Sequence, residues 1–297
     1  LYAFDSSFRD IILQRGYKII RNEIGYEHAN QCRKAAPSAI IDRRNEEDSM
    51  KIMLSPTKQM KPVNREPLQL PHFINDSEVI CERLKQLSAD ELRTLMKINE
   101  KIAVENVQRY QNMTFSLAGS PALYTYNGLQ FKHMGVENFS QEDAAYAQNC
   151  IRILSGMYGV LRPMDAIQPY RLEMQTRLPI GECRDLYAYW GDRLAHFLLQ
   201  EEGEKPCIIN LASKEYSKAV YPYLCEESTY TVTFLIEKAG RLKTESTQVK
   251  MARGAMVNWI ITQRISTAEE LIAFHADGYA YHKELSKAQE LVFMKRK

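Results

Sequence analysis

Apolar residues recur at helical spacing over long parts of the sequence. Residues 76–112 show this periodicity, and Ser88 with Glu91 forms the capping-box pattern that marks a helix start within the stretch. A second helix is predicted to begin at Ser140, because acidic residues follow in its first turn, and its apolar positions continue to Leu154. Further helices are predicted at 185–201, directly after Ser213, at 251–264 and at 267–274.

Short apolar runs bounded by turn residues predict the strands. They lie at 51–56, 122–126, 206–211, 229–236, 242–249 and 290–294. The runs at 229–236 and 242–249 flank Ala239 and Gly240, so we expect them to form a β-hairpin. Strands and helices alternate without a strict βαβ repeat. We therefore predict an α/β (mixed α+β) fold, with a single compact domain and a mixed sheet flanked by helices.

The first 49 residues differ from the remainder of the chain. They are mixed in charge and weakly periodic, and the polar run at 42–49 is typical of a solvated linker. Met50 stands directly before the first predicted strand. Either the protein starts at Met50 and the residues before it come from an over-extended reading frame, or they form a genuine extension. We therefore expect an N-terminal extension over 1–49 and a domain over 50–297.

Composition narrows the class of protein without identifying a function. Hydrophobic residues make up 45% of the 297 positions, which is enough to bury a substantial core. The formal net charge is only +2 and the isoelectric point is ≈ 8.1. Many DNA-binding domains are far more basic, so DNA binding by this chain would require a local basic patch.

Cysteine and histidine spacing gives no sign of a metal site. The six cysteines include no CxxC pair, and the six histidines include no HxxxH or HExxH pattern. We therefore expect reduced thiols, no metal and no cofactor. No apolar run reaches the roughly 18 residues that a membrane span needs, and the N-terminus lacks the order of a signal peptide, so we predict a cytoplasmic protein.

Several segments, taken in order along the chain, form a specific signature. The strongest is ILSGMYGVLRPMD at 153–165, which is followed by PYRLEM at 169–174. Further segments of the signature are 54–58, 186–192, 209–216, 250–256, 278–279 and 291–293. Together they resemble the YaaA family of peroxide-stress proteins, from residue 50 almost to the C-terminus. The resemblance implies a response to hydrogen peroxide that limits iron-linked damage, an unusual single-domain α/β fold, and binding of duplex DNA through a positively charged cleft and a helix-hairpin-helix.

We place the helix-hairpin-helix between Ser155 and Pro163, with Gly156 and Gly159 in its turn and Arg162 after it. Glycine has no Cβ, so the backbone can approach a phosphate and direct its N–H groups at the oxygens. Pro163 can open the second helix at its first position. The alternative is a helix C-cap at Gly156 and a tight turn at Gly159, with no ligand.

Cations also follow the ends of predicted strands. Lys58 follows the first strand and Lys214 follows the strand at 206–211, in positions that commonly build sites in α/β folds. Lys250 and Arg253 stand at a predicted helix start, where an anion would offset their unfavourable interaction with the helix dipole. Each cation has a simpler alternative as a solvated surface charge. The residues predicted to bind DNA are Lys58, Ser155, Gly156, Tyr158, Gly159, Arg162, Tyr170, Arg171, Lys214, Lys218, Lys250 and Arg253.

Aromatic and acidic residues lie among these cations. Tyr158, Tyr170 and Tyr216 can stack on unpaired bases, and their alternative is packing in the core. Glu173, Asp185 and Asp192 lie near Arg171 and Tyr189, and we expect these carboxylates to orient the arginines through paired hydrogen bonds.

Three classes of function compete. The favoured one is binding of double-stranded DNA, including DNA with unpaired bases, without sequence specificity and without an obligate protein partner or a membrane. The alternative is an enzyme acting on a nucleotide or phosphate ester in the same cleft, with Ser55 or Ser213 beside Lys58 or Lys214 as a nucleophile pair. No Walker A, GxSxG or GxGxxG motif supports catalysis, so no catalytic residue is predicted. Iron storage would need Glu-x-x-His motifs, which the sequence lacks.

Overall fold

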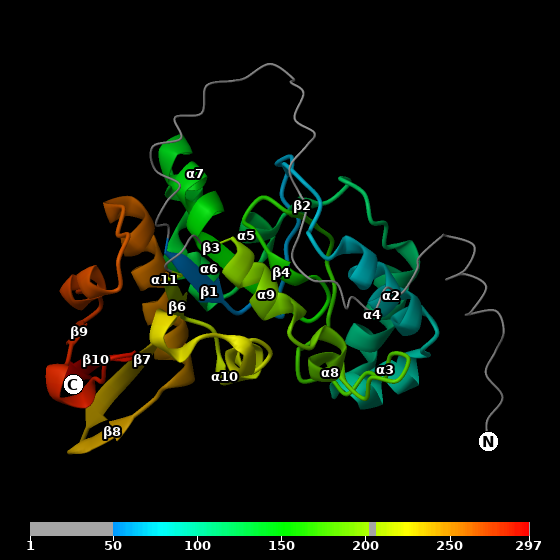
Figure 1. The fold of residues 1–297 in the computed structure, drawn as a ribbon. Helices are drawn as coiled ribbons and strands as arrows, with labels where there is room; N and C mark the ends of the chain where they lie inside the picture. Colours follow the sequence, from blue (N-terminus) through cyan, green and yellow to red (C-terminus); the bar gives the residue numbers. More distant parts are fainter. Residues whose placement is uncertain (1–49, 202–205, 297) are drawn as a thin grey trace, which may run out of the picture. The chain divides into compact units, whose positions relative to one another are not determined.

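A central mixed sheet organises the part of the chain that the structure describes, residues 50–201 and 206–296 of a computed structural model (Figure 1). The predicted extension over 1–49 lies outside the described residues. The sheet has eight strands in the order β4-β3-β1-β6-β7-β10-β9, with β8 paired to β7. The bounds are β1 (Lys51–Leu54), β3 (Ile151–Ser155), β4 (Gly159–Leu161), β6 (Ile208–Asn210), β7 (Thr229–Lys238), β8 (Arg241–Lys243), β9 (Tyr279–Tyr281) and β10 (Glu290–Arg296). A small second sheet pairs β2 (Ser120–Pro121) with β5 (Ala166–Ile167).

The inner strands of the large sheet are parallel. β1 lies between β3 and β6, with Ile52 opposite Ile151 on one side and Ile209 on the other. β7 pairs in parallel with both β6 and β10, whereas β4, β8 and β9 pair antiparallel with their neighbours. Parallel strands covered on both faces are mostly apolar, and all four residues of β1 are buried, three of them apolar.

Helices pack on the sheet and on one another (Figure 1). The α-helices are α2 (Ile74–Lys85), α3 (Ala89–Met96), α4 (Glu100–Asn112), α5 (Ala122–Thr125), α6 (Leu129–Met134), α7 (Gln141–Cys150), α8 (Leu186–Trp190), α9 (Arg193–Gln200), α10 (Lys214–Ser217) and α11 (Ser246–Gln263). The 3-10 helices are η2 (Val136–Asn138), η3 (Tyr221–Tyr223), η4 (Glu226–Ser228), η5 (Glu269–Ala273) and η6 (Lys283–Leu285). α11 packs along α6 and also contacts α7 and β7, while α4 packs on α2 and α3.

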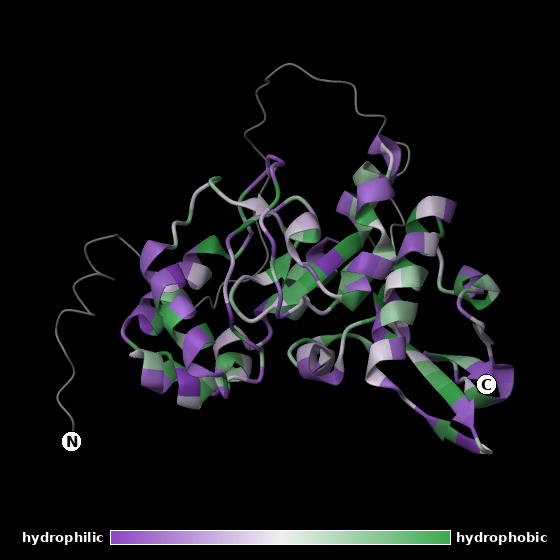
Figure 2. Cartoon of the chain, turned by 180° about the vertical axis from the view of Figure 1, so that it is seen from behind, coloured by the Kyte–Doolittle hydropathy of each residue, from purple (hydrophilic) through white to green (hydrophobic). Residues whose placement is uncertain are grey.

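The core lies between the sheet and these helices. Hydrophobic residues are concentrated along the strands, and the helices around them carry mixed hydrophobic and polar residues (Figure 2). Trp190 and Tyr110 are among the largest side chains that are fully buried. None of the helices within 50–201 and 206–296 combines the length and the hydropathy that crossing a membrane requires.

The predicted fold class and the two helix starts with polar caps are confirmed. The Ser88 side chain accepts a hydrogen bond from the Glu91 N–H, and the Glu91 carboxylate accepts one from the Ser88 N–H. Ser140 and Asp143 form a second capping box at the start of α7. These local patterns need no tertiary contact, which is why they can be read from sequence.

Two predictions are wrong about whether an apolar run forms a helix or a strand. The helix that begins at Ser140 ends at Cys150, and residues 151–155 form β3 instead, with every residue buried. An apolar run fits a buried strand as well as a helix, so periodicity does not place this boundary. The run 122–126, predicted as a strand, is mostly the single helical turn α5, which Pro121 precedes.

Two other predicted elements have different bounds. The helix predicted over 185–201 is divided at Gly191 into α8 and α9. The second strand of the predicted hairpin is shorter than expected, because residues 246–249 form the first turn of α11 rather than part of β8. The strand at 290–294 is confirmed and extends to Arg296.

The helix-hairpin-helix predicted around Gly156 and Gly159 is not formed there. These residues belong to the turn and the second strand of a buried antiparallel β-hairpin made by β3 and β4. Gly159 has a φ of +71°, and a Cβ on it would lie 2.9 Å from side-chain atoms of both Leu194 and Phe73. The glycine therefore allows the hairpin to pack closely in the core. Neither Gly156 nor Gly159 is exposed to a phosphate, because both are buried.

Candidate functional site

The candidate site lies where the order of the central strands reverses. From β1 the chain continues to β3 on one side of β1, whereas β6 lies on the other side and leads on to β7. β1 and β6 are parallel neighbours, so their carboxyl ends meet at the same edge of the sheet. In open α/β sheets, ligands bind in the crevice at such a reversal point.

Ser55 and Ser213 join the two loops that leave this edge. The Oγ of Ser55 accepts a hydrogen bond from the backbone N–H of Ser213 at 2.8 Å and donates one to the Ser213 Oγ at 3.2 Å. Within the second loop, the Asn210 Oδ1 accepts from the Ala212 N–H at 3.0 Å. These contacts fix the start of α10 against the end of β1.

A pocket of ≈ 380 Å³ opens beside this pair of serines. Its volume is within the range of ligand sites in proteins, which is about 300–1,000 Å³. Its wall is built from the loop after β1, the start of α6, the segment 170–173, the start of α10 and the first half of α11. The lining residues are Ser55, Pro56, Thr57, Lys58, Gln59, Asn127, Gly128, Leu129, Gln130, Tyr170, Arg171, Leu172, Glu173, Ser213, Glu215, Tyr216, Lys250 and Arg253.

Arg253 is a cation of this pocket whose positive charge is not offset by a hydrogen bond or an ion pair within the described chain. It forms no hydrogen bond or ion pair with any described residue, and its Nε atom is buried. Burial lowers the pKa of the guanidinium to about 10, because removal from water penalises the charged form. The group is still charged at neutral pH, and a lowering of this size corresponds to about 3 kcal/mol of unfavourable burial.

The position of Arg253 follows from the packing of α11 on α6. The adjacent residue, Gly254, faces α6 so closely that a Cβ on it would lie 2.2 Å from the backbone oxygen of Gln130. No side chain fits in that space, so the two helix backbones are in contact. This contact sets Arg253 and Gln130 side by side in the wall of the pocket.

Arg171, Glu173 and Lys58 form a charged cluster on another wall. The Glu173 Oε1 lies 2.8 Å from both the Arg171 Nη2 and the Lys58 Nζ. Burial opposes ionisation of Glu173, but the hydrogen bond and charge of Lys58 and the charge of Arg171 outweigh it and lower the pKa of the carboxyl. Of the three carboxylates predicted to orient arginines, Glu173 binds Arg171 through one hydrogen bond, whereas Asp185 caps α8 and Asp192 lies near His196. The Arg171 Nε is buried and has no partner among the described residues.

Gln130 contributes a third donor of the same kind. Its side-chain Nε2 is buried without a hydrogen-bond partner in the described ranges, and the residue is only 5% exposed. Three residues that line the pocket, Gln130, Arg171 and Arg253, therefore each carry a buried N–H donor that the described protein leaves unsatisfied. Buried polar groups are nearly always paired, so three such donors on one pocket indicate a ligand rich in acceptors.

Glu215 is a second acidic group in the pocket and behaves differently from Glu173. Burial raises the pKa of this carboxyl, and the negative charge of Glu173 adds to the effect. Its Oε1 accepts a hydrogen bond from the Gln175 N–H at 3.3 Å. The direction of this shift shows that a second negative charge beside Glu173 is unfavourable at this position.

The tyrosines that were predicted to stack on unpaired bases pack in the core instead, which was the alternative interpretation. Tyr170 is 4% exposed, and its hydroxyl lies 2.8 Å from the Tyr126 hydroxyl and 2.7 Å from the Ser155 Oγ. The Ser155 Oγ in turn accepts from the Met157 and Tyr158 N–H groups of the β-hairpin turn. Ser155 and Tyr158 therefore support the wall of the pocket from behind and do not line it.

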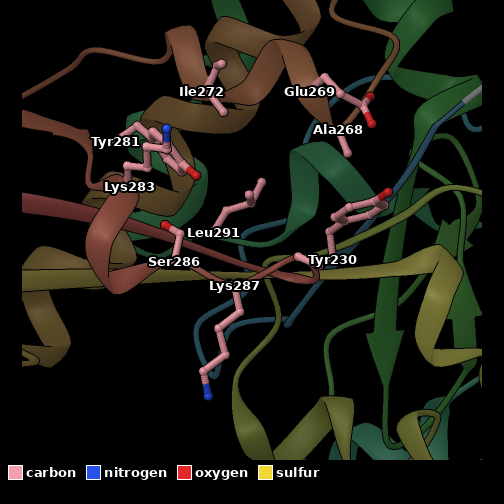
Figure 3. Close-up of a pocket in the computed structure, with 10 residues that line it drawn as sticks. Tyr230, Ala268, Glu269, Ile272, Tyr281, Lys283, Ser286, Lys287 and Leu291 are labelled. Atoms are coloured by element: carbon pink, nitrogen blue, oxygen red, sulfur yellow. The ribbon is translucent and has the colours of Figure 1, made fainter.

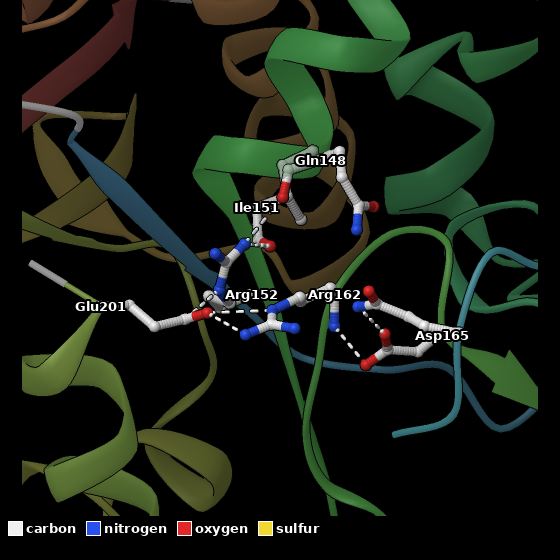
Figure 4. Close-up of polar contacts among 7 residues, drawn as sticks. Gln148, Ile151, Arg152, Arg162, Asp165 and Glu201 are labelled. Atoms are coloured by element: carbon white, nitrogen blue, oxygen red, sulfur yellow. Dashed lines mark hydrogen bonds and ion pairs between the residues drawn. The ribbon is translucent and has the colours of Figure 1, made fainter. Parts of the chain in front are cut away.

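Arg162 lies in a separate cluster and does not reach the pocket (Figure 4). Its Nε and Nη2 lie 2.9 Å and 2.7 Å from the Glu201 Oε1, and Arg152 binds the other carboxylate oxygen at 2.5 Å. Asp165 accepts from the Arg162 backbone N–H at 2.9 Å and from the Gln69 side chain. The Arg162 side chain therefore connects the end of β4 to the end of α9.

Three of the predicted lysines occupy the helices around the site. Lys250 lines the pocket and is exposed, but it lies in the second turn of α11, which starts at Ser246. The expected conflict with a helix dipole at its first turn therefore does not arise. Lys214 and Lys218 are exposed on α10 and do not line the pocket, and the Lys218 Nζ lies 4.7 Å from the centre of the Tyr187 ring.

A second cavity of ≈ 440 Å³ lies near the C-terminal strands (Figure 3). Tyr230, Ile272 and Leu291 give it a largely apolar wall, and the Lys287 side chain extends away from the other labelled residues. No lining residue of this cavity has a buried side-chain donor left unpaired within the described chain. It therefore defines no ligand chemistry.

Sequence reasoning missed Gln130 and Glu215 as site residues. Gln130 lies on a short helix that no motif marks, and only its contact with Gly254 brings it to the pocket. Glu215 lies directly after Lys214 at the start of α10, where an acidic residue is ordinary for a helix start. Of the predicted residues, the structure brings together at the pocket Lys58, Tyr170, Arg171, Lys250 and Arg253.

Comparisons with known proteins agree with the signature in the sequence. Residues 50–285 match the family described as "Peroxide stress protein YaaA". A UPF0246 protein of Clostridioides difficile (strain 630) is 45% identical over 249 residues, which cover 83% of this chain and 100% of that protein. UPF0246 proteins of Agathobacter rectalis and Cupriavidus metallidurans are 39% and 40% identical, each over 83% of this chain and 99% of its own length. The chain therefore belongs to the YaaA family of peroxide stress proteins.

Proposed function

We propose that this protein binds DNA without sequence specificity during the peroxide response and limits iron-linked oxidative damage. The observation that carries the proposal is the partly buried Arg253 side chain, whose buried Nε has no acceptor among the described residues and which lines a pocket with other residues that carry unsatisfied donors. A phosphate group supplies both the negative charge and the acceptor oxygens that such a site requires. The prediction of DNA as the phosphate source comes from the family resemblance.

Exposed lysines that line the pocket, or that lie on or directly after α10, suit a phosphate backbone. Lys58 is 61% exposed at its side chain, and Lys250 is exposed on α11. Lys214 and Lys218 lie on the exposed face of α10, beside Ser213. Lysine contacts with phosphates release counterions and carry no base code, so binding should depend steeply on salt and weakly on sequence.

Fluorescence anisotropy with the full chain and a labelled duplex tests this proposal. We expect affinity to fall with rising salt and to be lost in the double variant Lys250→Glu with Arg253→Glu. A charge-matched control is the double variant Lys283→Glu with Lys287→Glu, because both lysines are exposed at the second cavity. Loss of binding in the double variant with retention in the control supports DNA binding at the pocket. No binding by the unmodified protein at low salt would overturn the proposal.

A second candidate function is catalysis on a phosphate ester in the same pocket. The observation that favours it is the presence of two serine hydroxyls and a carboxyl with a raised pKa, from Ser55, Ser213 and Glu215, on one wall. Lys58 pairs with Glu173 and not with either serine, so the predicted serine–lysine nucleophile pair has no support in the contacts. Incubation with nucleotides and labelled DNA, followed by separation of products, tests this alternative.

A further inference from the structure

We infer that the floor of this pocket, formed by Arg253, Arg171 and Gln130, receives the terminal phosphate of a small phosphomonoester. The inference rests on the proposed function only in taking the ligand to be a phosphate. The proposed function assigns the buried donors to the continuous phosphodiester backbone of DNA. The present inference assigns them instead to a phosphate that is esterified at only one oxygen.

The residues of this pocket carry an unusual share of the unsatisfied buried atoms. Six buried side-chain polar atoms lack a partner in the described chain, and three of them belong to residues of this pocket. All three are N–H donors, on Gln130, Arg171 and Arg253. A terminal phosphate presents three non-ester oxygens as strong acceptors. A phosphate also offsets the positive charge of Arg253, which an uncharged acceptor does not.

The net charge of the side chains that line the pocket is positive. Lys58, Arg171, Lys250 and Arg253 bring four positive charges, and Glu173 and Glu215 bring at most two negative charges. The surplus is therefore at least two positive charges. A phosphomonoester carries about −1.5 to −2 at neutral pH, whereas an internal phosphodiester carries only one negative charge. The monoester matches the surplus more closely.

The burial of the three donor atoms limits which phosphates can approach them. The three donor atoms have almost no accessible surface, and Gln130 is only 5% exposed. An internal phosphodiester continues into the chain at both ester oxygens and needs two exits from the point where it binds. A monoester needs one exit. The pocket of ≈ 380 Å³ has room for an organic group above the phosphate, where the Ser55 and Ser213 hydroxyls offer polar contacts.

Isothermal titration calorimetry with the full chain tests this inference. The probes are inorganic phosphate, adenosine 5′-monophosphate and adenosine, with the variants Arg253→Met and Gln130→Leu and the control Lys287→Met. We expect at least one phosphate probe to bind, adenosine not to bind, and affinity to fall at least tenfold in Arg253→Met but not in the control. Circular dichroism melting confirms that each variant is folded. Absence of binding by both phosphate probes, or equal binding by folded Arg253→Met, would overturn the inference.

A DNA arm separates failure of this inference from failure of the proposed function. Anisotropy compares a duplex that carries 5′-phosphates with the same duplex without them, and adenosine 5′-monophosphate is added as a competitor. Stronger binding of the phosphorylated duplex, with displacement by the nucleotide, supports the inference. Binding of both duplexes alike, with no binding of the nucleotide, overturns the inference and leaves DNA binding in place. Binding of the nucleotide with no binding of DNA overturns the proposed function alone.

Discussion

Ser55 and Ser213 are 158 positions apart, yet the Oγ of Ser55 accepts from the backbone N–H of Ser213 at 2.8 Å. This bond joins the loop after β1 to the start of α10, at the edge where the two neighbouring parallel strands β1 and β6 end. The pocket that carries the candidate site lies beside it. Its shape therefore depends on a contact that neither loop makes alone.

Replacement of Ser55 by alanine leaves the Ser213 N–H without this acceptor. The contact is partly buried, so we expect the free energy of unfolding to fall by about 1 kcal/mol. We also expect weaker binding of the pocket ligand, because the loops lose their mutual support. Urea denaturation with Ser116→Ala as an exposed control checks the stability change. An unchanged free energy of unfolding would show that water replaces the serine without cost.

Arg253→Met separates stability from binding. The substitution removes a buried charge that the described protein does not compensate, so we expect the unliganded protein to become more stable by about 1–3 kcal/mol. The same variant should lose anion binding. Thermal and urea denaturation check the first effect, with Lys250→Met, an exposed residue of the same pocket, as the matched control. A loss of stability in Arg253→Met would mean that packing of the guanidinium outweighs its desolvation.

Glu201→Gln should destabilise the fold through the cluster shown in Figure 4. Glu201 binds both Arg152 and Arg162, and Arg152 is only 5% exposed at its side chain. Loss of the negative charge leaves a buried arginine uncompensated, at a cost of about 3 kcal/mol. Urea denaturation measures it, and Glu105→Gln, from an exposed pair within α4, is the control. Equal effects of the two substitutions would contradict this account.

The pH dependence of Glu201 provides an independent check of the same cluster. Burial raises the pKa of this carboxyl, but Arg152 and Arg162 outweigh burial and lower it below its usual value. A lowered pKa contributes stability that is present above the unfolded value and is lost as the pH falls through the folded value. The unmodified protein should therefore lose stability in acid more steeply than Glu201→Gln.

Asp165 should show the opposite dependence on pH. Burial raises the pKa of this carboxyl to about 6, despite hydrogen bonds from the Arg162 N–H and Gln69. A raised pKa contributes stability that is present at low pH and is lost as the pH rises from about 4 to about 6. The stability of Asp165→Asn relative to the unmodified protein should therefore rise across this window, by up to about 3 kcal/mol. A difference that stays constant from pH 4 to 7 would contradict this.

The position of the candidate site could be predicted from the sequence, because residues that follow parallel strands lie at one edge of the sheet. Lys58 follows β1, and the signature segments place Arg171 and Arg253 among turn and helix residues. Parallel strands share one edge for their carboxyl ends, so the loops after β1 and β6 meet there whatever lies between them in the chain. The capping boxes were equally readable, since each needs only residues three positions apart.

The remainder depends on contacts between distant residues. Arg162 is a cation beside a glycine turn in the sequence, but Glu201 neutralises it in the fold. Residues 151–155 fit a helix in their apolar pattern, and only pairing with β1 makes them a strand. Gln130 reaches the pocket because Gly254 permits two helices to touch. Sequence spacing encodes none of these three contacts.

The most direct test of the central claim is the resonance of the Arg253 side-chain Nε–H in proton–nitrogen NMR spectra, assigned by its loss in Arg253→Met. The full chain is titrated with duplex DNA at low salt while binding is followed by anisotropy. We predict that this resonance shifts in proportion to the bound fraction, because a phosphate oxygen becomes the acceptor that the buried Nε lacks. DNA binding that leaves the Arg253 Nε–H unchanged would contradict the claim that this pocket is the phosphate-binding site.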